Sequence, residues 1–141
     1  KDIVGLPVSI RIIDRKFKIQ FVWDEDVADA LYLAIKEDYH GAYNIAGDGY
    51  VTPEDIAEIM DVPALPTFYH IARMTTWLLW NLHIFKNMSP GWVKMGANPV
   101  IIGCDKAGKE MGWKASLDSR GAFARFVKEM GPILHAEKAK K

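Results

Sequence analysis

Apolar and polar residues alternate in some parts of the chain and follow a helical period in others. Phe17, Ile19 and Phe21 are separated by polar residues, which predicts a half-buried strand over 16–22. Further strands are expected at 8–13, 42–45 and 100–102, and helices at 24–37, 52–60, 67–85, 105–112 and 118–130. This mixture predicts an α/β fold of the α+β-like type, with few short strands and about five helices.

Signals at the expected helix ends support these assignments. Thr52 followed by Pro53 is typical of a helix start, and the acids at 24–26 suit a first helical turn. Gly112 is expected to end a short helix, and Gly131-Pro132 to end the last one. We therefore expect a single domain over residues 1–131, followed by a flexible lysine-rich tail over 132–141.

The charge and the cysteine content limit the binding partners and the cellular compartment that we expect. The 141 residues contain 18 basic and 18 acidic residues, and the net charge of zero predicts no attraction to nucleic acid or to an anionic membrane. The most apolar stretch, 74–85, is too short to cross a bilayer. A single cysteine, Cys104, fits a reducing compartment, so a cytoplasmic location is expected.

Aromatic residues are concentrated in the expected helix 67–85, which is apolar over much of its circumference. Tyr69, Trp77, Trp80 and Ile84 fall outside its main apolar stripe. The aromatic residues whose role is open are Tyr69, Trp77, Trp80 and Phe85. They could line a small-molecule pocket, contact another chain, or belong to the internal core. The sequence leaves these three interpretations open.

Other reactive side chains have simpler explanations. Asp24, Glu25, Asp26 and Asp29 could form a metal or acid–base site, but acids in a first helical turn also complement the helix dipole. The four histidines lack the spacing of a metal site, and Cys104 has no obvious base beside it. We therefore expect no metal site in this chain.

Five segments, in order along residues 17–128, resemble the C-terminal region of the extended short-chain dehydrogenase/reductases, the NAD-dependent epimerase/dehydratase family. They are residues 20–28 (Q-F-V-W-D-E-D-V-A), 41–48 (G-A-Y-N-I-A-G-D), 52–59, 105–113 (D-K-A-G-K-E-M-G-W) and 119–127. The resemblance implies the substrate-binding part of that fold, and it places Arg15, Gln20 and Trp23 toward the substrate.

The family's nucleotide-binding half has no counterpart in this sequence. Its glycine-rich turn between a strand and a helix is missing, because Gly41, Gly47 and Gly49 follow a different element with different spacing. Tyr32 and Lys36 match the spacing of the family's Tyr-x-x-x-Lys pair, but they come after the Q-F-V motif, whereas the family's pair precedes it. We therefore assign no catalytic and no cofactor-binding residue to this chain, although the family itself uses NAD or NADP.

Two main functions follow from these expectations. In the first, the chain is a truncated epimerase/dehydratase-like domain, non-catalytic alone, that self-associates or binds a small molecule through Arg15, Gln20, Trp23, Tyr69, Trp77 or Trp80. In the second, it is part of a complete NAD(P)-dependent epimerase, dehydratase or reductase whose nucleotide-binding half is supplied elsewhere. The partner is then a second copy or that missing half. An acid–base enzyme using Asp24 or Asp26 with a histidine is a third interpretation.

Overall fold

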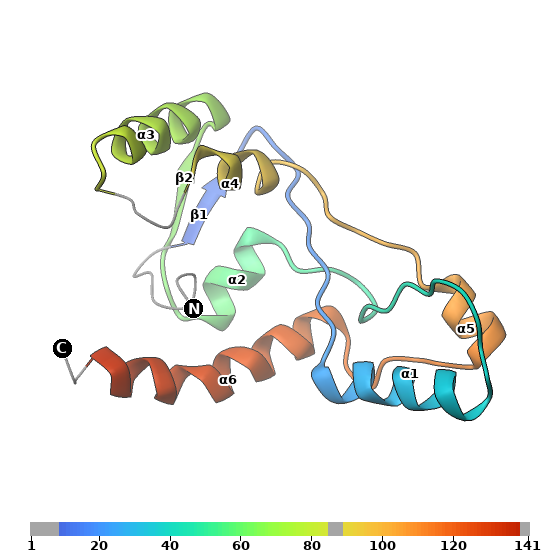
Figure 1. Ribbon diagram of the computed structural model, residues 1–141. Coiled ribbons are helices and arrows are strands. Elements are labelled where there is room, and N and C mark those ends of the chain that lie inside the picture. Colours follow the sequence, from blue (N-terminus) through green and yellow to red (C-terminus); the bar gives the residue numbers. More distant parts are fainter. Residues whose placement is uncertain (1–8, 85–88, 139–141) are drawn as a thin grey trace.

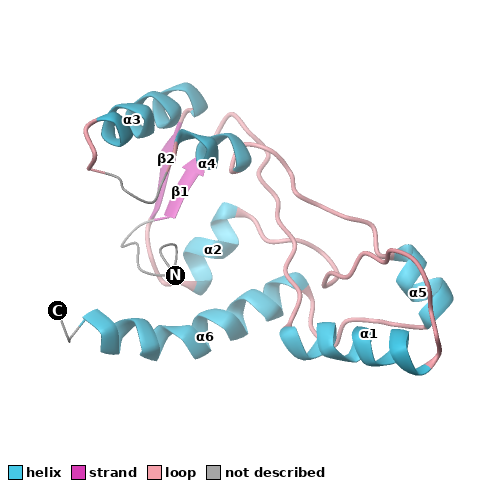
Figure 2. Cartoon of the chain, viewed as in Figure 1, coloured by secondary structure: helices cyan, strands magenta, loops and turns pink. Residues whose placement is uncertain are grey.

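The computed structural model describes residues 9–84 and 89–138, which form six helices and two short strands (Figures 1 and 2). The elements are β1 (Ser9–Ile12), α1 (Asp24–Lys36), α2 (Pro53–Ile59), β2 (Ala64–Thr67), α3 (Tyr69–Asn81), α4 (Pro90–Met95), α5 (Asp105–Met111) and α6 (Ser119–Lys138). The expected small mixed α/β fold is therefore confirmed. Figure 1 shows the sheet, α3 and α4 at one end of the molecule, α1 and α5 at the other, and α6 extending between them.

The sheet has two parallel strands, and only the first was expected. β1 pairs with β2 in a register that runs from Ser9–Ala64 to Ile12–Thr67. The connection between them passes through α1 and α2. α2 packs against both strands, and an ion pair of 2.6 Å between Arg11 Nε and Glu54 Oε1 links β1 to it.

The other three expected strands, at 16–22, 42–45 and 100–102, are wrong. Ile19 makes one isolated bridge to Val51 and another to Val100, and the rest of these segments is extended loop. A strand needs a neighbour that runs beside it for several residues, and here each contact lasts for a single residue. Residues 100–102, three consecutive apolar residues, are exposed.

Helix starts agree with the sequence better than some helix ends. Thr52 and Asp55 form a capping box at the start of α2, and Gly112, with φ of +64°, ends α5. α3 ends at Asn81 rather than at the expected residue 85. His83, two residues after the helix end, has a φ of +57°. Phe85 lies outside the described residues.

The expected end of the last helix at Gly131-Pro132 is also wrong, because α6 continues to Lys138. A proline removes its own N–H and crowds the preceding turn, but the residues after it remain free to form helical hydrogen bonds. α6 is therefore longer than α3, the element expected to be longest.

One small cluster of buried hydrophobic residues lies near α1 and α5. It consists of Ala30, Ala107, Met111 and Trp113. The whole chain exposes 9755 Å², about one third more than the roughly 7,300 Å² expected for a compact protein of this size. Much of the apolar surface of the helices is consequently exposed.

Candidate functional site

The six site residues expected from the sequence lie in three separate places. Arg15 and Tyr69 meet between the end of β1 and the start of α3. Gln20 and Trp23 belong to the extended segment before α1. Trp77 and Trp80 lie on α3, two to three turns beyond Tyr69.

Arg15 and Tyr69 form a contact that positions α3. The Arg15 guanidinium carbon lies 4.9 Å from the centroid of the Tyr69 ring, a cation–π geometry. The carboxylate of Asp14 accepts a hydrogen bond of 2.8 Å from the Tyr69 backbone N–H, at the first residue of α3. The loop after β1 therefore caps the helix.

Gln20 joins three backbone segments through its side-chain amide. Its oxygen accepts a hydrogen bond of 2.7 Å from the Ile102 backbone N–H, and its NH₂ group lies 3.5 Å from the carbonyl oxygen of Gly47. Ile102 and Gly47 belong to segments that lack strand partners at these positions. The amide thus substitutes for part of the missing sheet pairing.

Trp23 is a buried residue rather than a residue on an open binding face. It precedes α1, and the Arg125 guanidinium carbon of α6 lies 4.4 Å from its ring centroid. Asp26, one turn further on, is also buried. Its carboxylate accepts a hydrogen bond of 2.9 Å from the Ser116 backbone N–H. Its backbone carbonyl oxygen accepts one of 3.0 Å from Trp113 Nε1. Trp23 Nε1 and Asp26 Oδ2 are buried without a hydrogen-bond partner in the described part of the chain.

The acidic residues at the start of α1 do not converge on one point. Asp26 is buried, whereas Asp24, Glu25 and Asp29 are exposed. Across residues 9–84 and 89–138, no group of three or more histidine, cysteine or acidic residues has an arrangement that could hold a metal ion. Cys104 is partly buried before α5, with its sulfur 3.9 Å from the Ala46 carbonyl oxygen.

Trp77 and Trp80 do not belong to the internal core, since their exposed fractions are 56% and 39%. Thr76 is the buried residue of α3, and the helix packs against α4. At α4 there is a shallow hollow of about 260 Å³, lined by Ser89, Gly91, Trp92 and Met95.

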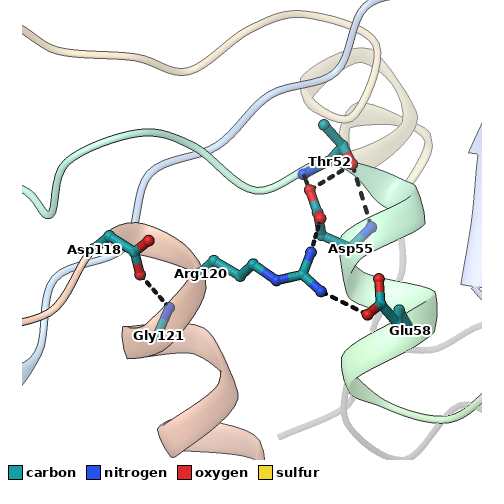
Figure 3. A network of polar contacts seen from close by, with 6 residues as sticks. All are labelled: Thr52, Asp55, Glu58, Asp118, Arg120 and Gly121. Atoms are coloured by element: carbon teal, nitrogen blue, oxygen red, sulfur yellow. Dashed lines mark hydrogen bonds and ion pairs between the residues drawn. The ribbon is translucent and has the colours of Figure 1, made fainter.

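Arg120 of α6 forms a polar network that the sequence did not predict (Figure 3). Its guanidinium pairs with the carboxylate of Asp55 and, at 2.8 Å, with Glu58 Oε1. Asp55 also accepts hydrogen bonds of 2.6 Å and 2.9 Å from the hydroxyl and backbone N–H of Thr52. One arginine therefore connects α6 to the capped start of α2.

The network shifts the pKa values of its two central groups. The hydrogen bond from the Thr52 hydroxyl lowers the pKa of the Asp55 carboxyl, against the opposing effect of partial burial, and Arg120 lowers it further. The hydrogen bond to Glu58 raises the pKa of Arg120. Both groups are thus held in their charged forms, as in a structural ion pair.

Tyr32 and Tyr43 each have a lysine nearby, Tyr32 four positions before Lys36 and Tyr43 under the ammonium group of Lys106. Tyr32 and Lys36 are both exposed on α1. Tyr43 donates a hydrogen bond of 2.8 Å to Glu110 Oε2, which raises the pKa of Tyr43.

Within the described ranges, no helix combines the length and the apolar character that crossing a membrane requires.

Comparisons with known proteins give one structural likeness. No protein-family model and no curated protein matches the chain. A solved structure titled "Crystal structure of gox2253" is similar over 91% of this chain, with a TM-score of 0.52 and 20% sequence identity. At that identity the likeness concerns the fold alone. The matched part is 42% of the gox2253 chain, so this chain spans less than half of its neighbour's length.

Proposed function

We propose that this chain is the substrate-side part of an NAD(P)-dependent protein of the epimerase/dehydratase type, non-catalytic by itself and completed by a nucleotide-binding half. The observation that carries the proposal is a second apolar stripe on α1. Leu31, Tyr32 and Ile35, here named the α1 outer stripe, have exposed fractions of 60%, 64% and 82%. The opposite side of the same helix buries Ala30 in the core.

A helix that is apolar on two sides is typical of a helix enclosed between two layers. In the described chain, α1 has one such layer, formed by α5 and the segment around Trp113. The other side faces solvent, which is unfavourable for three large apolar side chains. A further polypeptide layer against the α1 outer stripe would remove this exposure.

Two further facts support the proposal. The structural likeness covers less than half of a longer chain, so the same fold occurs as part of a larger protein. The five segments that resemble the family follow one another in the family's order. Gln20 and Trp23 are structural residues in this proposal, and Arg15 with Tyr69 remains the candidate substrate contact.

The test compares the 141-residue chain with the same chain co-expressed with a nucleotide-binding half. The chain alone is expected to bind no NADH or NADPH in calorimetry and to catalyse no hydride transfer. Co-expression is expected to give a stable complex that Leu31→Asp weakens by tenfold or more, because the substitution places a charge in an apolar contact. NAD-dependent turnover by the chain alone would overturn the proposal.

Self-association through the tryptophan-bearing helix remains a prediction. Its test is light scattering across a dilution series of the purified chain. A dimer that survives dilution would favour a stand-alone module over a part of a larger enzyme.

A further inference from the structure

The side of α3 that faces away from the protein is apolar. Thr76 marks its buried side. Ile71, Met74, Trp77 and Leu78, here named the α3 face, lie on the opposite arc of the helix, and each is at least half exposed. Four large side chains in one arc form a patch rather than scattered exposed residues, and such patches mark interaction sites.

The sequence segment that carries this face has charges of one sign. From Val62 to Cys104 the sequence contains no aspartate and no glutamate, although the chain as a whole is neutral. Arg73 on α3 and Lys94 on α4 are the basic residues of the described part of this stretch, and both are exposed. The zero net charge of the chain therefore conceals a sequence segment whose formal charges are all basic, although the carboxylate of Asp14 lies at the start of α3 with Arg15 next to it in sequence.

This charge distribution indicates which partner the α3 face suits. In a symmetric contact with a second copy, both partners would bring helices whose own charges are all basic to the same interface, and like charges would oppose the contact. A surface of anionic phospholipids supplies the negative charge that the region lacks. Tryptophans are also enriched at the boundary between headgroups and acyl chains.

We propose that the α3 face binds the surface of an anionic phospholipid membrane, with α3 lying in the plane of the interface. The 13-residue helix is about 20 Å long, too short to span a bilayer, but a helix that lies on the surface needs no such length. Met74, Trp77 and Leu78 enter the headgroup boundary, while Arg73 and Lys94 attract the phosphates. The binding does not depend on the proposed function, because it uses neither α1 nor a nucleotide.

The expectation of no membrane partner rested on the net charge of the whole chain. That average is the correct guide only when the two signs are interspersed. Here every acidic residue lies outside 62–104, so the formal charges that α3 and α4 themselves carry are all basic.

The experiment mixes the 141-residue chain with two kinds of vesicle, pure phosphatidylcholine and phosphatidylcholine containing phosphatidylglycerol, and measures co-sedimentation and tryptophan emission. We expect binding to the anionic vesicles, with a blue shift of the emission, and at least tenfold weaker binding to neutral ones. The double variant Met74→Ser/Trp77→Ser should bind at least tenfold more weakly. Arg73→Gln should bind about fivefold more weakly, and added salt should remove that difference.

Ile35→Ser is the matched control, because Ile35 is an equally apolar and more exposed side chain on α1, away from α3. It should bind anionic vesicles like the unmodified chain. Circular dichroism checks the helix content of every variant, and single Met74→Ser replaces the double variant if the latter unfolds. Absence of binding to anionic vesicles would overturn the proposal, as would equal weakening by Ile35→Ser. Self-association that the Met74 and Trp77 substitutions abolish, without vesicle binding, would assign the face to a second copy instead.

Discussion

The hydroxyl of Ser119 donates a hydrogen bond of 2.9 Å to the carbonyl oxygen of Gly47, although the two residues are 72 positions apart. Ser119 is the first residue of α6 and is completely buried. Its hydroxyl oxygen also accepts a hydrogen bond of 3.3 Å from the Phe21 backbone N–H. One side chain thus joins α6, the loop at Gly47 and the extended segment before α1.

We expect that no residue larger than glycine is tolerated at position 47, where these three segments meet. A Cβ added to Gly47 would lie 2.8 Å from the Phe21 carbonyl oxygen, and 2.9 Å from both the Leu117 oxygen and the Ser119 nitrogen. All three neighbours are backbone atoms, which cannot move aside like the end of a side chain. Gly47→Ala is expected to lower the free energy of unfolding by about 2 kcal/mol or more, as overpacking does, measured by urea denaturation.

Gly108→Ala provides the matched control. Gly108 lies inside α5, and its added Cβ would have its nearest contact at 3.8 Å, an ordinary van der Waals distance. Alanine in a helix interior is about 0.5–1 kcal/mol more favourable than glycine, so this variant should be at least as stable as the unmodified chain. Equal changes in the free energy of unfolding for Gly47→Ala and Gly108→Ala would contradict the close packing around Gly47.

The pair of Asp55 and Arg120 should make stability depend on acid pH. The pKa of Asp55 is lowered in the folded chain, so the unfolded state takes up a proton first as the pH falls. The stability from this group is present above the unfolded pKa of about 3.9 and is lost as the pH falls through the lower folded value. Asp55→Asn should be less stable at neutral pH and should lose less stability on acidification.

Asp29→Asn is the control for this pH effect, since Asp29 is exposed on α1. Its unfolding free energy, followed by denaturant titration from neutral pH to below pH 4, should parallel that of the unmodified chain. If Asp55→Asn lost as much stability on acidification as the unmodified chain, the folded carboxyl would not have a lowered pKa. Thr52→Ala, which removes the cap and one hydrogen bond to Asp55, should cost about 1 kcal/mol.

Loss of the indole N–H should lower the free energy of unfolding by different amounts at the two buried tryptophans near α1. Trp113 Nε1 donates a hydrogen bond of 3.0 Å to the Asp26 carbonyl oxygen, whereas Trp23 Nε1 has no partner in the described part of the chain. Replacement by phenylalanine removes similar volume in both cases. Trp113→Phe should therefore cost about 1 kcal/mol more than Trp23→Phe in thermal or urea unfolding. An equal or reversed cost would contradict this difference in hydrogen bonding.

The α1 outer stripe should contribute little to the stability of the chain alone. Because Ile35 is 82% exposed, Ile35→Ser is expected to change the unfolding free energy by less than about 0.5 kcal/mol. A loss of 2 kcal/mol or more in urea unfolding would show that Ile35 is packed within the chain, and the argument for an additional layer would fail.

Local features of the sequence predicted local features of the structure. The cap at Thr52 and the helix end at Gly112 depend on neighbouring residues alone, and both are present. Strand β2 was missed because Pro66 argues against a strand. It is accommodated in a sheet of only two strands, where each strand has a free edge that needs no donor. The start of α4 at Ser89-Pro90 carried a usable signal, a proline at the first helical position.

The candidate site was harder to predict because it depends on contacts between distant segments. The bond between Gln20 and Ile102 joins residues 82 positions apart, and no local pattern indicates it. A helix that is apolar over much of its circumference, such as α3, gives little sign of which side will be buried. The acid-free stretch from Val62 to Cys104 could have been found by counting charges segment by segment rather than over the whole chain.

The most direct test of the proposal that this chain is one part of a larger nucleotide-dependent protein is the coding sequence immediately upstream of Lys1. The account predicts an in-frame segment with a strand, a glycine-rich turn and a helix, the pattern that binds the pyrophosphate of NAD(P). A stop codon followed by a ribosome-binding site directly before Lys1 would contradict it.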